Sequence, residues 1–273
     1  MQQRKIAFIG AGNMAQAIVA GLIDEGYPAR HISLSSPSGT HRDALAAKYG
    51  VISSADNVQS AREADVIVLA VKPQMMAAVC EPLRQQVDFT GKLVLSIAAG
   101  ISIARFQALL GETLNIVRIM PNTPSLVGKG MSGLYAPAAV STADREFTAG
   151  LMKSVGKVCW VENEQDINGV IAAAGSAPAY FFLFMEAMQQ EAIRQGFDAH
   201  TARLLVQQSA SGAAALVEAS PDTPLSTLRE NVTSKGGTTA AALQVFNERQ
   251  LTQTVAEAMQ AAVDRAREME KLF

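Results

Sequence analysis

A glycine-rich turn near the N-terminus has the residue types that hold a dinucleotide. Residues 10–15 read GAGNMA, a GxGxxA pattern between an expected strand and an expected helix. The first glycine permits a tight turn, the second lets backbone amides approach a pyrophosphate, and the small third residue lets helix pack on strand. A plain turn of small residues would look similar, but the place after the first strand favours dinucleotide binding. We therefore assign cofactor contacts to Gly10, Gly12, Asn13 and Met14.

The end of the second expected strand indicates which dinucleotide the chain takes. An NAD-binding protein usually carries Asp or Glu there to accept the ribose 2′-hydroxyl. This chain has Ser35, Ser36 and Ser38 instead, and Arg42 follows. These groups can receive a 2′-phosphate without repelling it, so NADPH is the preferred cofactor and NADH the alternative. Arg42 could equally be a solvated helix residue.

Further polar turns follow the next strands at their carboxyl ends, where doubly wound sheets bind ligands. Residues 70–73 read AVKP, and Lys72 in them faces either the cofactor or plain solvent. Residues 96–100 and the rigid turn 120–124, MPNTP, are aimed at the same edge. The last turn offers Asn122 and Thr123 for hydrogen bonds.

A second glycine- and hydroxyl-rich segment lies in the C-terminal half. Residues 232–239 read VTSKGGTT and stand just before an expected helix, so free amides at the helix start suit a carboxylate. The segment also reads as an ordinary N-cap with a flexible approach. No histidine lies in any of these turns. Without a strong base, the set fits reduction of a polarised C=N bond better than oxidation of an alcohol.

Two halves of different pattern must position these turns. Up to residue 162 short apolar runs alternate with helical stretches, which is typical of a Rossmann-like, doubly wound parallel sheet. Residues 163–273 read as an all-helical domain for dimerisation and substrate binding. The expected strands are residues 6–9, 32–35, 66–70, 93–96, 115–119 and 157–161. The expected helices are residues 14–25, 40–49, 75–84, 166–195, 199–219, 238–247 and 251–272.

Composition excludes several classes of function. The 23 Lys and Arg against 25 Asp and Glu give a net charge of −2, with no basic tract to hold nucleic acid. Cys80 and Cys159 are expected to be buried thiols, and the three scattered histidines indicate no metal site. The apolar run 170–185 is shorter than the roughly 20 residues that span a bilayer, so we expect a buried helix and a cytoplasmic protein without a membrane partner.

The apolar character of the second half also predicts an oligomer. Helices with this little charge carry more hydrophobic face than their own layer can cover, which suggests a homodimer through the C-terminal helices.

Five segments together resemble the pyrroline-5-carboxylate reductase family, in order and over essentially the whole chain. They are residues 10–15 (GAGNMA), 70–73 (AVKP), 118–124 (RIMPNTP), 175–180 (GSAPAY) and 233–239 (TSKGGTT). The resemblance implies the last step of proline biosynthesis, in which NAD(P)H reduces 1-pyrroline-5-carboxylate to L-proline. It also implies an interleaved dimer, often assembled further into a ring of dimers such as a decamer.

The resemblance assigns roles to individual residues. Thr239 matches the threonine that hydrogen-bonds the ring nitrogen, and it or a water delivers the proton. Three residues match the family loop that holds the substrate carboxylate: Ser234, Gly237 and Thr238. Asn57 matches a family asparagine near the adenosine ribose of the cofactor. The family turn beside the nicotinamide corresponds to Ala70, Lys72 and Pro73, and Pro178 matches a helix break that shapes the pocket. Lys235 and Ala177 depart from the family, which often has proline and glycine there.

Two alternatives remain open on the sequence. A β-hydroxyacid dehydrogenase shares the two-part architecture but uses a helix lysine as acid and base, and residues 165–195 contain no lysine. A non-catalytic NADP-binding sensor would have no need for the intact loop at residues 234–239.

Overall fold

The computed structural model describes residues 2–111 and 114–272. By packing, the chain divides into two compact units, one of Met1–Ser176 with Ala261–Phe273 and one of Ala177–Gln260. This division differs from the expected boundary at residue 162, because the segment after that residue and the last turns of the chain pack with the sheet. Each unit is described by itself below.

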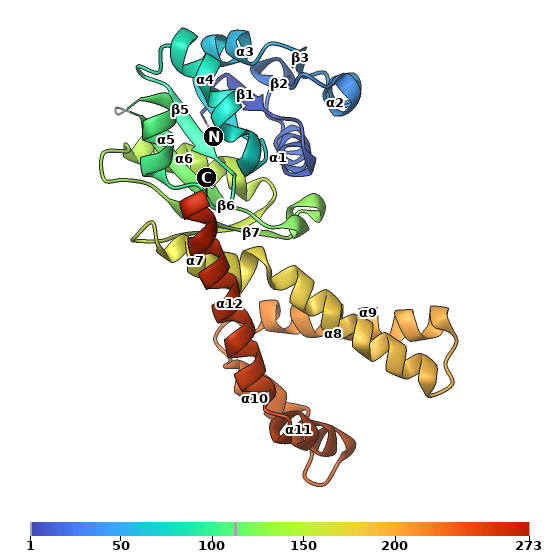
Figure 1. Ribbon diagram of the computed structural model, residues 1–273. Helices are drawn as coiled ribbons and strands as arrows, with labels where there is room; N and C mark the ends of the chain where they lie inside the picture. The colour runs from blue at the N-terminus through green and yellow to red at the C-terminus, as the bar shows by residue number, and fades with distance from the viewer. Residues whose placement is uncertain (1, 112–113, 273) are drawn as a thin grey trace. The chain divides into compact units, whose positions relative to one another are not determined.

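The first unit is built on an eight-stranded sheet, counted over the described residues, in the order β3-β2-β1-β4-β5-β6-β7-β8 (Figure 1). Strands β1 to β6 are parallel, whereas β7 pairs antiparallel with β6 and parallel with β8. Only residues 121–129 join β6 to β7, which is too short for a parallel crossover. The strands are β1 (Ile6–Ile9), β2 (Ile32–Ser35), β3 (Ile52–Ser54), β4 (Val66–Leu69), β5 (Leu93–Ser96), β6 (Asn115–Met120), β7 (Gly130–Tyr135) and β8 (Gly156–Trp160).

Helices cover both faces of this sheet, which confirms the doubly wound class. On β1, Ile6 and Phe8 pack into one core with α1, α2 and α6, while Ala7 and Ile9 pack into another with α3, α4 and α5. Continuous apolar strands therefore have a physical reason, since neither face meets water. The helices are α1 (Asn13–Asp24), α2 (Gly39–Tyr49), α3 (Asn57–Glu63), α4 (Met76–Gln86), α5 (Ile103–Leu110), α6 (Thr142–Lys153) and α7 (Asp166–Val170).

Two strands escape the sequence prediction, each for a local reason. Strand β3 has three residues, two of them exposed, so it shows no apolar run. Strand β7 reads GMSGLY, and glycine is unfavourable in strands. Its Gly133 is required by packing, because a Cβ there would lie 2.6 Å from Val170 Cγ1.

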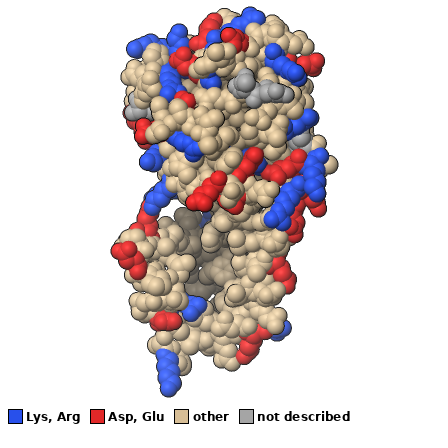
Figure 2. All heavy atoms as spheres, turned by 90° about the vertical axis from the view of Figure 1, so that its left-hand side faces the viewer, with Lys and Arg blue, Asp and Glu red and all other residues tan. Residues whose placement is uncertain are grey.

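The second unit is helical, as expected. It contains α8 (Ala177–Arg194), α9 (Ala199–Ala219), α10 (Leu225–Asn231), α11 (Thr238–Glu248) and the first part of α12 (Leu251–Leu272). The expected single helix from residue 166 is instead α7, a π-helical turn at Ile171–Gly175 and α8. On the face shown in Figure 2, charged side chains are more frequent on the sheet-bearing unit than on the helical part.

The apolar side chains of α8 are largely exposed, so the expectation of a buried helix is wrong for the single chain. Phe181 is 66% and Leu183 67% exposed. By length and composition alone, the 29-residue stretch Asp166–Arg194 could cross a membrane, which the shorter apolar run did not predict.

The two cysteines were both expected to be buried, and only one is. Cys80 is buried, and this burial raises the pKa of its thiol to about 12. Cys159 is only half-buried.

A buried guanidinium fastens the end of the chain to the sheet. Arg118 on β6 is 1% exposed, and its Nη1 lies 3.1 Å from Glu164 Oε1 and 2.8 Å from Glu270 Oε1. Glu164 also accepts from the backbone N–H of Ile103 at the start of α5. A buried cation needs such partners, because desolvation would otherwise cost several kcal/mol. The last turn of α12 is thus part of the first unit.

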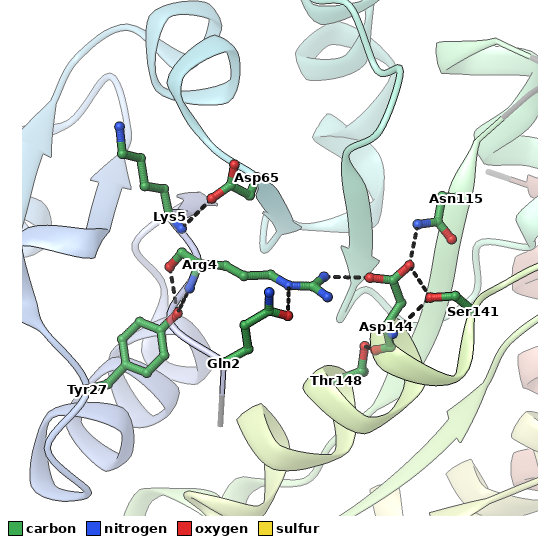
Figure 3. A network of polar contacts seen from close by, with 9 residues as sticks. All are labelled: Gln2, Arg4, Lys5, Tyr27, Asp65, Asn115, Ser141, Asp144 and Thr148. Atoms are coloured by element: carbon green, nitrogen blue, oxygen red, sulfur yellow. Dashed lines mark hydrogen bonds and ion pairs between the residues drawn. The ribbon is translucent and has the colours of Figure 1, made fainter.

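A second polar network joins the N-terminal segment to α6 (Figure 3). The Arg4 guanidinium pairs with the Asp144 carboxylate, which also accepts from Asn115 Nδ2 at 2.9 Å and Ser141 Oγ at 2.8 Å. Arg4 stacks over the Phe147 ring. Burial alone would raise the pKa of Asp144, but the hydrogen bonds from Arg4, Asn115 and Ser141 outweigh it and hold that pKa below its ordinary value.

We predict that Asp144→Asn lowers the free energy of unfolding at pH 7 by about 1–3 kcal/mol, because charge-assisted hydrogen bonds are lost. A depressed carboxyl pKa contributes stability above the unfolded-state pKa, and this is lost as the pH falls through the folded-state value. The gap between variant and wild type should therefore shrink in urea unfolding as the pH falls below about 4. Glu63→Gln, at an exposed site, is the control. A gap that is independent of pH would contradict the assignment.

Candidate functional site

The glycine turn lies where three strands end together. The register pairs Ile9 with Ser35 of β2 and with Leu69 of β4, so the residues that follow emerge at one edge of the sheet. The N–H of Gly10 donates to the Ser35 carbonyl at 2.8 Å. Gly10 has φ +109°, and a Cβ there would lie 2.6 Å from the Ala70 carbonyl oxygen. Only glycine fits, which explains the first position of the motif.

The second glycine leaves space instead of filling it. Gly12 is the N-cap of α1, with φ −72°, and no side chain caps the helix start. A Cβ on Gly12 would meet nothing within 4 Å, whereas Ala15 is buried in the core. Open space before the free N–H groups of a 12-residue helix fits a pyrophosphate. Asn13 is exposed and Met14 half-buried beside this opening.

The serines after β2 divide into different roles. Ser35 is 0% exposed, and its hydroxyl donates to Asn57 Oδ1 at 2.6 Å. Asn57 begins α3 directly after Asp56, which caps that helix by accepting from Val58 and Gln59 N–H. The Ser35 hydroxyl therefore holds Asn57 in place at the strand edge. Ser36 is half-buried, and Ser38 is exposed at the N-cap of α2.

Arg42 folds back from α2 onto the loop after β2. Its Nη1 donates to the Ser36 carbonyl at 2.6 Å, and its side chain is 13% exposed. The solvated alternative for Arg42 is thus not what the structure shows. The sequence prediction missed its other partner, Asp43, whose place directly after Arg42 was the available signal. Nε of Arg42 donates to Asp43 Oδ1 at 2.8 Å.

The turn after β4 lies at the same edge. The Ala70 carbonyl lies close to the Gly10 backbone, and the Ala70 N–H donates to the Ile9 carbonyl at 2.8 Å. Lys72 is exposed and precedes a 3-10 turn at Pro73–Met75. Pro73 fixes φ at the first position of this turn, where no N–H is needed.

The Asn122 side chain was expected to be free to bind a ligand, but both of its ends are hydrogen-bonded within the protein. Asn122 is buried, its Nδ2 donates to the Ala174 carbonyl at 3.0 Å, and its Oδ1 accepts from Met131 N–H at 2.8 Å. Both ends of the side chain therefore hold the turn after β6 against its neighbours. Thr123, which begins the next 3-10 turn at Thr123–Val127, is exposed.

The second glycine segment forms a tight turn before α11. Gly236 has φ +71°, and Gly237 N–H donates to the Ser234 carbonyl at 3.1 Å. A Cβ on Gly237 would lie 2.3 Å from Ser234 Oγ, so the serine hydroxyl sits against the helix start. Gly237 is the N-cap, and no side chain caps the helix. Thr238 and Thr239 follow in its first turn, where free N–H groups favour an anion.

The structure thus gathers the expected residues into two sets. Gly10, Gly12, Ser36, Asn57 and Ala70 share one sheet edge in the first unit. Ser234, Gly237, Thr238 and Thr239 share one turn in the second unit, whereas Pro178 lies in the first turn of α8. Among the residues the structure describes, no group of three or more His, Cys, Asp or Glu could hold a metal ion.

The two glycines of the first motif give opposite predictions. Gly12→Ala should leave the free energy of unfolding within about 0.5 kcal/mol of wild type but weaken NADPH binding at least about tenfold, because the added methyl would occupy the space expected for the pyrophosphate. Gly10→Ala should destabilise the fold by about 2 kcal/mol or more, because of the positive φ and the Ala70 carbonyl. Urea unfolding and titration of NADPH fluorescence measure both effects. Normal NADPH binding by Gly12→Ala would contradict the site.

Two protein-family models match separate parts of the chain. Residues 5–100 match the model described as NADP oxidoreductase coenzyme F420-dependent. Residues 164–269 match the model described as pyrroline-5-carboxylate reductase dimerisation. The first match contains the glycine turn and the turn after β4, and the second contains the segment at residues 234–239.

Similar proteins extend over the whole chain. A pyrroline-5-carboxylate reductase of Vibrio alginolyticus is 65% identical and covers 100% of both chains. The structure of a pyrroline-5-carboxylate reductase from Coxiella burnetii is 41% identical with a TM-score of 0.93, over 98% of this chain and 99% of that one. Pyrroline carboxylate reductase of Plasmodium falciparum, solved with NADP bound, is 28% identical with a TM-score of 0.87 and 99% coverage of each. This chain therefore belongs to the pyrroline-5-carboxylate reductase family.

Proposed function

We propose that the chain reduces the C=N bond of 1-pyrroline-5-carboxylate to give L-proline, with NADPH as the preferred reductant and NADH as a poorer one. The observation that carries the proposal is the pair of open helix starts, one at Gly12 and one at Gly237, in a chain similar to these reductases over its full length. Each start offers free N–H groups to an anion. A pyrophosphate and a carboxylate are the two anions that the reaction requires the protein to hold.

Residues at the sheet edge would hold the cofactor. Gly10, Gly12, Asn13 and Met14 would hold the pyrophosphate, with the open space at Gly12 in its favour. Ser35 holds Asn57, which would contact the adenosine ribose. Ser36 and Arg42 lie where a 2′-phosphate would follow β2. Ala70, Lys72 and Pro73 line the turn toward the nicotinamide. When bound, NADPH supplies the hydride that adds to the imine carbon.

The turn before α11 would hold the substrate. Ser234 Oγ and the N–H groups of Thr238 and Thr239 suit its carboxylate, since O–H and N–H donors form charge-assisted hydrogen bonds with carboxylate oxygens. Gly237 lines the same position, while its own N–H is used by the Ser234 carbonyl. Thr239 donates a hydrogen bond to the ring nitrogen, and the proton reaches that nitrogen from Thr239 or a water. Protonation of this nitrogen makes the imine an iminium, which accepts hydride readily, so the residues mainly hold and orient the substrate and exclude water.

A homodimer through the helical unit is part of the same proposal. A mostly apolar groove in that unit is lined by residues that include Phe184, Met188, Leu205 and Phe246, with Glu191 and Gln195 among its polar residues. The rings of Phe184 and Phe246 lie 5.9 Å apart. Exposed apolar side chains along α8 favour burial against a second copy. We extend the proposal to a ring of dimers such as a decamer in the cytoplasm, without a nucleic-acid or membrane partner.

The proposed activity is tested by the loss of NADPH absorbance with 1-pyrroline-5-carboxylate, beside parallel assays with NADH and with a 3-hydroxy acid plus NADP. Rapid oxidation with the imine alone is expected. Activity on the hydroxy acid but not the imine would overturn the proposal. Binding of NADPH without turnover in either assay would favour a sensor.

Removing the Thr239 hydroxyl should affect turnover and not cofactor binding. We expect Thr239→Ala to lower kcat about 10- to 100-fold, the range for one hydrogen bond made in the transition state, with an unchanged Kd for NADPH. Thr239→Ser keeps the hydroxyl and should recover most of the activity. An equal loss of NADPH affinity in Thr239→Ala would show that the residue serves the fold or the cofactor instead.

A negative charge introduced at position 36 should change the cofactor preference. Ser36→Asp places a carboxylate beside the expected 2′-phosphate, so kcat/KM should shift from NADPH toward NADH by about tenfold or more. Ser36→Asn is the uncharged control of similar size and should change the ratio little. An unchanged ratio in Ser36→Asp would mean that the 2′-phosphate lies elsewhere.

A further inference from the structure

The guanidinium of Arg42 is already engaged by a carboxylate. Nε donates to Asp43 Oδ1 at 2.8 Å, and Nη2 lies 3.2 Å from Asp43 Oδ2, so the pair meets along one side of the guanidinium. Nη1 donates to the Ser36 carbonyl at 2.6 Å. One N–H on each terminal nitrogen is left for another acceptor. Arg42 can therefore still reach a phosphate, but with its charge partly neutralised.

The carboxylate is held in this position from two further sides. Ser53 Oγ on β3 donates to Asp43 Oδ1 at 2.6 Å. Asp43 Oδ2 would lie 2.4 Å from a Cβ on Gly39, so the side chain folds back over the first turn of α2. The hydrogen bonds from Arg42 and Ser53 lower the pKa of Asp43, which is thus ionised at neutral pH. A negative charge is fixed next to the loop at Ser36.

This arrangement opposes what the neighbouring serines favour. Serine hydroxyls and an arginine after β2 suit a 2′-phosphate, whereas a carboxylate in the same place suits a ribose 2′-hydroxyl. Asp43 brings such a carboxylate to the loop through Arg42 and not from the strand end. Its effect is smaller than that of an acid at the strand end, because Asp43 is 57% exposed and solvent screens it.

We propose that Asp43 is a specificity-determining residue that weakens the preference of the enzyme for NADPH over NADH, by neutralising Arg42 beside the 2′-phosphate position. The inference rests on the proposed cofactor site. It makes Arg42 and Asp43 one unit, in which the arginine attracts the phosphate and the aspartate limits that attraction.

The test uses 2′,5′-ADP and 5′-AMP as probes, which differ in the 2′-phosphate, and measures their Kd on the full-length protein by calorimetry. Asp43→Asn should tighten 2′,5′-ADP about two- to fivefold, the effect of removing a solvent-screened charge, and leave 5′-AMP unchanged. The ratio of kcat/KM for NADPH to that for NADH should rise by the same factor. Ser53→Ala, which keeps the carboxylate but removes one of its anchors, should change the ratio less.

A second background shows whether Asp43 acts through Arg42. Arg42→Gln should weaken 2′,5′-ADP and leave 5′-AMP unchanged, and adding Asp43→Asn to it should have no further effect. An undiminished effect in that background, or weaker 2′,5′-ADP binding by Asp43→Asn alone, would overturn the proposal. Loss of the preference in Arg42→Gln with no effect of Asp43→Asn would overturn the role of Asp43 alone. If neither variant changes a strong wild-type preference for 2′,5′-ADP, the placement of the 2′-phosphate beside Arg42 is wrong as well.

Discussion

The close approach of the Gly10 backbone to the Ala70 carbonyl is the contact on which the proposed cofactor site depends. It brings the turn after β1 against the turn after β4, while the Gly10 N–H holds the end of β2. With three strand ends joined in this way, α1 starts at Gly12, next to this edge of the sheet, and no side chain caps the free N–H groups of its first turn. A side chain at position 10 would separate these strands before it affected any ligand.

Local sequence patterns were sufficient for much of the fold and for the outline of the site. Strands β1 and β5 lie at their expected residues because both of their faces pack into apolar cores, and the Rossmann glycines lie in their expected turn. Strand β2 also lies at its expected residues, with Ile32 and Leu34 in one core. Strand β7 was missed because it contains glycine. Gly133 is required there by the close packing of Val170, which comes much later in the chain. Roles that depend on a distant partner were also missed. Asn122 and Ser35 look like free polar groups in the sequence, and only the fold shows that Ala174 and Asn57 use them.

The two units differ in how completely they bury their apolar residues. The sheet-bearing unit buries its apolar residues on both sides of the strands and carries ion pairs such as Arg4 with Asp144. The helical unit leaves Phe181 and Leu183 exposed, so its stability depends on what covers them. The turn at residues 234–239, which we propose holds the substrate, is in this second unit, so the proposed function links the order of this turn to assembly.

The pairing of Arg118 with Glu270 has a consequence for the order in which the protein is made. Arg118 is buried in a central part of the sheet, yet one of its two carboxylates comes from the last turn of the chain. While the chain is still being synthesised, Glu270 is absent and the guanidinium has only Glu164 to balance its charge. The packing around Arg118 is therefore complete only once Glu270 has been synthesised and the last turn of α12 has packed against the sheet, although every strand precedes this turn in the chain.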